Sequence, residues 1–253
     1  MASVPIVLLA SLRLAACLEP PPACDGSPAW PGQVALHEPA GFRVLSDQPW
    51  TALKGDGWGY LRRTSSKDDD ICADNATARS TALRIIFTPD MMPNTEPSVH
   101  WIGLPLVRAM YAAWYVKLSP NWTPSPAGGG KISFVHTPTA EVYMNVGGSS
   151  APHRINVNTE WPSYGPFREP NVTTTPVRYG QWYRIEWYLQ WESVPGAGDG
   201  VLRWWVDGVL NGDYRDVHYP IGGFGQFEFA PTLQNPPPEE QYMYIGHTYV
   251  SIP

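Results

Sequence analysis

Four segments of the sequence carry polar side chains on one of their two alternating faces, and the residue types suit the binding of a sugar polymer. The segments are 80–88, 140–146, 153–158 and 182–191. Their polar residues include Arg84, Tyr143, Asn145, Arg154, Asn156, Arg184, Glu186, Tyr188 and Gln190. Guanidinium and amide groups donate hydrogen bonds to hydroxyls and carboxylates, and tyrosine rings pack against pyranose rings. The pattern predicts a groove that binds a polysaccharide, and its arginines favour an anionic polymer such as a polyuronate.

One face of an antiparallel sheet can also simply contact water. A solvated face usually carries Lys, Glu, Thr and Ser, whereas these four segments contain no Lys and are rich in Arg and Asn. The composition therefore favours a binding surface over a solvated one.

The positions between these polar residues are apolar, which indicates strands that bury one face. The expected buried residues are Leu83, Ile85, Phe87, Val142, Met144, Val146, Ile155, Val157, Tyr183, Ile185, Trp187, Leu189 and Trp191. A further apolar run over 200–207 ends in Asp207-Gly208, a tight-hairpin signal. The polar set is thus expected to be positioned by short paired strands.

The composition of the 253 residues supports an all-β chain. It combines 12 Trp, 13 Tyr, 23 Gly and 28 Pro with only 16% charged residues, typical of short strands joined by Pro- and Gly-rich loops. Strands recur every ten to fifteen residues or so, which predicts one antiparallel β-sandwich domain over 41–253. The formal net charge of −6 argues against a nucleic-acid partner, because such partners need a basic face.

The strand 182–191, the paired Trp204-Trp205 before Val206-Asp207-Gly208, and the final run 242–251 together resemble the concanavalin A-like lectin and glucanase jelly rolls. Within that superfamily the chain is most similar to the polysaccharide lyase branch. The resemblance implies a jelly roll over about residues 40–253. It leaves the activity open, because this fold hosts lectins, hydrolases and lyases.

If the chain is a lyase, the resemblance implies Tyr143, His136 and Arg84 as its catalytic residues. The run Arg79–Arg84 is similar to the Arg-Ser/Thr-Glu-x-Arg strand of alginate lyases, without its Glu and with one residue more between the arginines. Phe134-Val135-His136 lies where that family has Gln-Ile-His. Since His136 shares its face of the strand with Ile132 and Phe134, it is expected to point into the core unless the strand bulges.

Glycoside hydrolysis is disfavoured, because a hydrolase of this fold needs two carboxylates that flank the scissile bond. No predicted strand carries two carboxylates on one face at a separation of two or four residues. Three interpretations stay open: a polysaccharide-binding protein, a lyase that cleaves a uronate polymer by β-elimination, and a structural surface protein without a glycan ligand.

Residues 1–17 resemble an export signal, with the short apolar core Val4–Ala10. Leu14-Ala15-Ala16-Cys17 is similar to a bacterial lipobox, so Cys17 is the candidate lipidation site and the lipid the only expected membrane contact. Pro-rich residues 18–40 are expected to form a tether. The protein is therefore predicted to be exported, either as an outer-membrane or cell-surface lipoprotein or as a secreted protein.

The three cysteines are an odd number for an exported protein. If Cys17 carries the lipid, Cys24 and Cys72 form the expected disulfide. No metal site or cofactor is predicted; the acidic run Asp68-Asp69-Asp70 could hold Ca²⁺, but a solvated acidic turn is the preferred interpretation.

Overall fold

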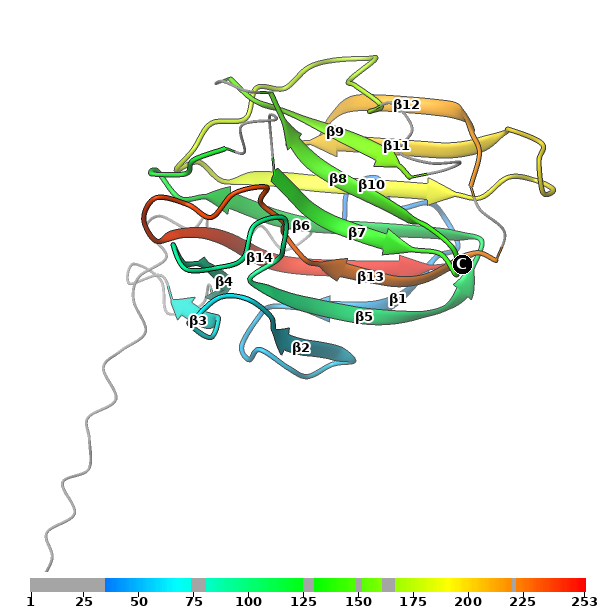
Figure 1. Cartoon of the computed structure of the whole chain (residues 1–253). Helices are drawn as coiled ribbons and strands as arrows, with labels where there is room; N and C mark the ends of the chain where they lie inside the picture. The colour runs from blue at the N-terminus through cyan, green and yellow to red at the C-terminus, as the bar shows by residue number, and fades with distance from the viewer. Residues whose placement is uncertain (1–34, 74–80, 125–129, 149–151, 161–166, 220–221) are drawn as a thin grey trace, which may run out of the picture.

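The computed structural model describes residues 35–73, 81–124, 130–148, 152–160, 167–219 and 222–253. These residues form two stacked β-sheets, and they contain no helix (Figure 1). Consequently the described part of the chain has no helix long and apolar enough to cross a membrane. All strand pairings between the named strands are antiparallel, as the sequence predicts.

The larger sheet has eight strands. Its order is β12 (Val209–Val217), β11 (Gly200–Val206), β10 (Tyr183–Gln190), β6 (Ala109–Leu118), β14 (Gln241–Ile252), β4 (Thr81–Phe87) and β3 (Asp70–Ala73), and β1 (Arg43–Gln48) pairs with β14. The hairpin between β11 and β12 turns at Asp207 and Gly208, which both have positive φ angles. Glycine and aspartate tolerate this backbone region, so the hairpin signal is confirmed.

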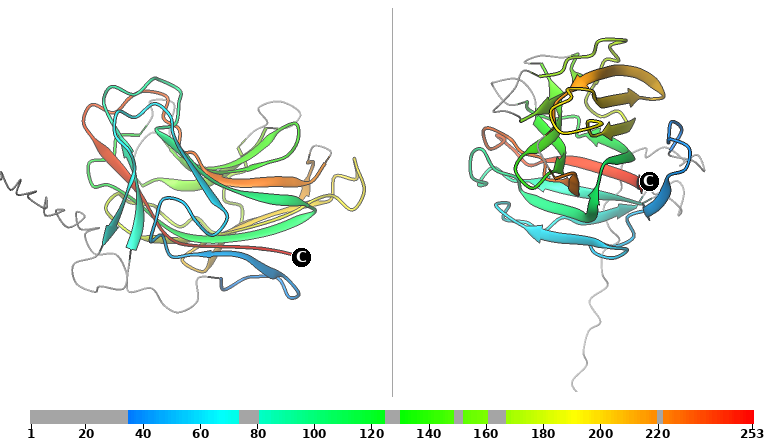
Figure 2. Two further views of the ribbon diagram at one scale, coloured as in Figure 1. Left: turned by 90° about the horizontal axis from the view of Figure 1, so that it is seen from below. Right: turned by 90° about the vertical axis from the view of Figure 1, so that its right-hand side faces the viewer.

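The smaller sheet has six strands. Its order is β2 (Trp58–Arg62), β5 (Ser98–Val107), β13 (Phe224–Phe229), β7 (Gly130–His136), β8 (Glu141–Gly147) and β9 (Arg154–Thr159). It faces the viewer in Figure 1, and the side view in Figure 2 shows the two sheets curving together. Each sheet therefore has one face in the core and one face outside.

The core lies between the two sheets and is dominated by aromatic residues. Trp114, Trp187 and Trp204 from the larger sheet are fully buried and meet Phe227 and Phe229 of the smaller one in the same cluster. Every inward residue predicted from alternation belongs to this cluster or packs against it. Burying a large apolar side chain stabilises the fold by about 1.5–3 kcal/mol, so this pattern is the main source of stability.

The first described residues belong to the folded unit. Ala35 is buried with Tyr111 and Tyr115 of β6, and the Glu38 carboxylate accepts a 2.7 Å hydrogen bond from the Tyr249 hydroxyl of β14. The sequence predicts a tether over residues 18–40, which includes this segment. Residues 35–39 instead form a strap across the outer face of the eight-stranded sheet, and residues 1–34 lie outside the described part.

Of the acidic run 68–70, only Asp68 is solvated, with 65% of its side chain exposed. The Asp69 carboxylate is buried, where the Ile86 backbone N–H and the His100 ring contact it at 3.1 and 2.7 Å. Asp70 is paired with Arg84. The solvated-turn interpretation therefore holds for Asp68 and is wrong for the other two: Asp69 joins strands of the two sheets, and Asp70 pairs within the eight-stranded sheet.

Cys72 in β3 is buried and disulfide-bonded. Its partner lies outside the described residues, as do Cys17 and Cys24, so the pairing with Cys24 stays a prediction. We expect Cys72→Ser to lower the free energy of unfolding by about 4 kcal/mol, since a bond to Cys24 closes a long loop in the unfolded chain. Urea unfolding without reductant measures the loss. Peptide mapping of the unreduced protein contradicts the pairing if Cys72 is linked to Cys17.

Candidate functional site

The structure divides the predicted polar set between two opposite surfaces. Strands β4 and β10 belong to the eight-stranded sheet, whereas β8 and β9 belong to the six-stranded sheet. Residues Arg84, Arg184, Glu186, Tyr188 and Gln190 therefore lie on one side of the sandwich, and Tyr143, Asn145, Arg154 and Asn156 on the other. The nine residues do not line one groove, because alternation along a strand does not specify its sheet.

The strap covers Glu186 of the predicted set, whereas Tyr188 is half-buried and Gln190 is exposed. The His37 ring stacks on Trp205, with 4.8 Å between ring centroids and 3° between planes. The His37 backbone N–H and ring Nδ1 contact Glu186 Oε2 at 3.0 and 2.9 Å, and the Tyr111 hydroxyl donates to the same oxygen at 2.5 Å. Arg184 Nε lies 3.3 Å from the other oxygen. Glu186 is 0% exposed, so it holds the strap and is closed to a polymer.

Arg84 is also committed to the protein itself. Its guanidinium pairs with both carboxylate oxygens of Asp70 and lies 5.0 Å from the centre of the Tyr242 ring. Because β4 is on the far side of the sandwich, Arg84 does not join His136 and Tyr143 as the lyase hypothesis expects.

A β-bulge in β7 places His136 on the outer face of the six-stranded sheet. The register with β8 shifts between Lys131 and Ser133. Ile132 and Val135 stay in the core, whereas Phe134 and His136 face outward beside Tyr143 and Glu141. The expectation of a core histidine is therefore wrong, because the extra residue of the bulge inverts the alternation.

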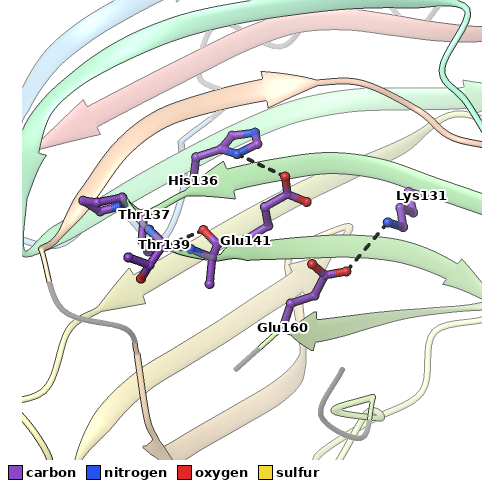
Figure 3. A pocket seen from close by; sticks show the side chains of 8 residues that line it. Lys131, His136, Thr137, Thr139, Glu141 and Glu160 are labelled. Atoms are coloured by element: carbon purple, nitrogen blue, oxygen red, sulfur yellow. Dashed lines mark hydrogen bonds and ion pairs between the residues drawn. The ribbon is translucent and has the colours of Figure 1, made fainter. Parts of the chain in front are cut away.

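His136 borders a polar depression of about 490 Å³ at one end of this face (Figure 3). The depression is lined by Lys131, His136, Thr137, Pro138, Thr139, Ala140, Glu141 and Glu160. Its charged side chains come from β7, from the start of β8 and from the residue that follows β9. Three consecutive strands thus bring together two cationic groups and two carboxylates.

Two carboxylates flank the His136 ring. Nε2 lies 2.8 Å from Glu228 Oε1 of β13, and Nδ1 lies 3.4 Å from Glu141 Oε1. Burial opposes the charged imidazolium, but Glu228, Glu141 and Glu160 outweigh it, so the pKa of His136 lies above its usual value of 6.5. The ring is suited to hold or transfer a proton near neutral pH.

The raised pKa of His136 predicts a pH-dependent stability. A histidine whose pKa is higher in the folded than in the unfolded state stabilises the fold fully below about pH 6.5, and this contribution is lost as pH rises through the folded pKa. Urea unfolding at several pH values, compared with His136→Gln, measures it. We expect the stability advantage of the unsubstituted protein to shrink with rising pH; an advantage that grows would contradict the assigned ion pairs.

Lys131 connects the depression to an aromatic surface. Its ammonium lies 4.2 Å from the Tyr143 ring centroid and 3.9 Å from Glu160 Oε1. Burial raises the pKa of Glu160, against the attraction of Lys131. The Tyr143 ring is 5.5 Å from that of Phe134 and 6.2 Å from that of Phe167, which is 44% exposed. Phe167 is therefore an exposed aromatic edge beside the charged depression.

The remaining predicted residues on this face form a hydrogen-bonded network. The Asn145 amide donates to Asn156 Oδ1 at 3.2 Å, and the Asn156 amide donates to Glu169 Oε1 at 3.1 Å. Arg154 pairs with the second oxygen of Glu169. Asn145 and Asn156 are about 95% buried, so they position the surface around Tyr143.

Sequence reasoning missed Lys131, Glu160 and Glu228 as site residues. Glu160 lies outside the strands that alternation predicts, and the side chains of 225–230 carry no strong polar pattern. Only the pairing of β13, β7 and β8 shows that these residues belong together. Among the described residues, no group of three or more His, Cys, Asp or Glu has the geometry to hold a metal ion.

The fold is an antiparallel β-sandwich of the jelly-roll type, as the sequence predicts. The alginate lyase vAL-1 from a Chlorella virus is similar with a TM-score of 0.58 and 13% identity, over 83% of this chain and 100% of that one. An endo-β-1,4-glucuronan lyase from the fungus Trichoderma reesei is similar with a TM-score of 0.56 and 14% identity, over 78% and 92%.

The carbohydrate recognition domain of Emp47p is similar with a TM-score of 0.50 and 12% identity, over 83% of this chain and 94% of that one. The sequence matches no protein-family model and no curated protein. At these identities the similarity establishes the fold, and the chemistry has to be argued from the side chains.

Proposed function

We propose that this protein recognises a polysaccharide on the outer face of the six-stranded sheet. The proposal is carried by one observation: Lys131, His136, Glu141 and Glu160 surround a polar depression beside the aromatic residues Tyr143 and Phe167. Carboxylates and ammonium groups bind sugar hydroxyls, and an exposed ring packs against the apolar face of a pyranose. The shared fold supports the proposal, because proteins named as polysaccharide lyases and a carbohydrate recognition domain have it.

Affinity electrophoresis through gels containing single polysaccharides tests the proposal. Retardation by at least one polymer is the expected result, and it should be reduced in Phe167→Ala. Val172→Ala is the control, because it removes another exposed apolar side chain further along the chain, and it should leave the retardation unchanged. Migration that no polysaccharide changes contradicts glycan recognition and favours a structural surface protein.

A lyase is the second candidate, because His136 and Tyr143 share one face on neighbouring strands. In β-elimination a base removes the proton next to the uronate carboxyl, an acid protonates the leaving oxygen, and a cation neutralises the carboxylate. His136 and Tyr143 supply the proton-transfer groups, and Lys131 replaces Arg84 as the cation. Incubation with polyuronates, followed by the absorbance of the unsaturated product, tests this. Polymer retardation without product contradicts the lyase and leaves recognition intact.

We further propose that residues 1–17 direct export and that Cys17 carries a lipid. The apolar run before Cys17 supports this proposal. Mass spectrometry of the membrane fraction from an expressing bacterium tests it: the expected mature chain begins at a lipidated Cys17, and an uncleaved N-terminus contradicts both parts.

A further inference from the structure

We infer that the glycan recognised at this site carries free amino groups, as a polymer of glucosamine type does, and is not a polyuronate. The inference rests on the proposed function and specifies its ligand. It follows from the balance of charge around the depression, from which side chains are already paired, and from which carboxylate oxygens remain open to solvent.

Carboxylates outnumber cations at the site. Glu141, Glu160 and Glu228 face two cationic groups, Lys131 and His136. His136 is counted as a cation because its raised pKa favours the protonated ring. Arg154 does not change the balance, because it is paired with Glu169. The described residues around the depression therefore carry a net negative charge, as does the whole chain at −6.

Both cations are occupied by carboxylates of the protein. Lys131 lies 3.9 Å from Glu160, and His136 lies between Glu228 and Glu141. A uronate carboxylate would have to displace one of these pairs and then lie beside the released glutamate. The arginines that favoured an anionic polymer in the sequence lie elsewhere: Arg84 and Arg184 are on the opposite face, and Arg154 is paired.

Glu141 and Glu160 keep acceptor capacity for an incoming donor, because their contacts with His136 and Lys131 are long, at 3.4 and 3.9 Å. The Glu141 side chain is 38% exposed, and its contact with His136 is the longer of the two, at 3.4 Å. Glu160 is the residue after β9, the strand next to β8. It is held beside Glu141, because the Glu160 backbone N–H donates a hydrogen bond to the Glu141 carbonyl at 3.0 Å. A sugar ammonium between them gains charge-assisted hydrogen bonds to both.

Phe167 supplies the apolar contact that such a ligand also needs. Its ring is exposed and lies against Tyr143, beside the depression. A pyranose ring on Phe167 brings its polar substituents over the carboxylates, so one sugar unit contacts both parts of the site.

Two oligosaccharides of equal length, one of N-acetylglucosamine and its fully deacetylated counterpart, test the inference because they differ only in the amino groups. Binding to the full chain is measured by calorimetry slightly below neutral pH, with an oligouronate of similar length as the anionic probe. We expect the deacetylated oligosaccharide to bind about tenfold more tightly than the acetylated one, and the difference to fall as salt is added.

Glu141→Gln keeps the shape of the side chain and removes its charge. It should therefore reduce the preference for the deacetylated form by about threefold or more. Glu160→Gln is the second variant with the same expectation. Asp56→Asn is the matched control, since Asp56 is exposed in the turn before β2 and its left-handed backbone suits Asn. It removes the same charge and should leave the preference unchanged.

The possible outcomes separate the inference from the proposed function. Equal binding of the two oligosaccharides, or tighter binding of the oligouronate, overturns the amino-glycan inference while glycan recognition stands. An equal loss of preference in Asp56→Asn also overturns it, because the effect would then come from net charge alone. Retardation by no polysaccharide in the gel assay overturns the proposed function itself.

Discussion

Glu186→Ala is expected to lower the free energy of unfolding by about 3–5 kcal/mol, because it leaves buried partners uncompensated. The Glu186 carboxylate contacts the Arg184 guanidinium, the Tyr111 hydroxyl and the His37 backbone and ring. Burial and the negative charge of Glu186 raise the pKa of Tyr111, which keeps its hydroxyl protonated as a donor. Without the carboxylate these donors stay in a dry environment, or the strap leaves the sheet.

Urea unfolding followed by tryptophan fluorescence measures this loss. Glu186→Gln is the conservative comparison and should cost less, since an amide oxygen still accepts from some of the donors. Gln190→Ala, at the exposed end of the same strand, should change stability by less than about 1 kcal/mol. A cost for Glu186→Ala no larger than that of Gln190→Ala would show that the strap and its carboxylate do not contribute to the fold.

His136→Ala is expected to weaken polysaccharide retention by about tenfold or more. Arg84→Ala should leave retention within about twofold of that of the unsubstituted protein. The sequence placed both residues in one site, but the structure places them on opposite surfaces. Removing the His136 ring leaves Glu228 and Glu141 without their shared partner, so the local charge and the shape of the depression both change.

The same gel assay measures both variants, and urea unfolding shows whether each is folded at the assay temperature. Arg84→Ala loses the ion pair with Asp70, so a moderate loss of stability is expected without a loss of retention. If Arg84→Ala abolishes retention and His136→Ala does not, the ligand binds to the eight-stranded sheet and the site proposed here is wrong.

Alternation in the sequence was sufficient to predict most of the strands and their buried faces. It predicts β10 with Ile185, Trp187 and Leu189 inward, because one buried face requires apolar residues with period two. It missed β5, in which His100 is buried and Pro105 interrupts the strand pattern. That histidine is buried because Asp69, distant in sequence, pairs with it, and a single strand contains no sign of such a partner.

The site was less predictable than the fold. His136 and Tyr143 were named as candidates from the sequence, and both lie on the outer face of the six-stranded sheet. Lys131, Glu160 and Glu228 were missed, because nothing in their local sequence connects them. The bulge in β7 also reversed the expected direction of His136, and one inserted residue is invisible to a strict period of two.

The sequence by itself determined the all-β jelly roll and the residues of its core, because burial of alternating apolar side chains is a local property of each strand. Only the tertiary structure decided which strands share a sheet, and so which polar residues share a surface. That choice depends on pairing between distant segments: it moved Arg84 and Glu186 away from Tyr143, placed the strap over Glu186, and gathered three carboxylates around His136 and Lys131.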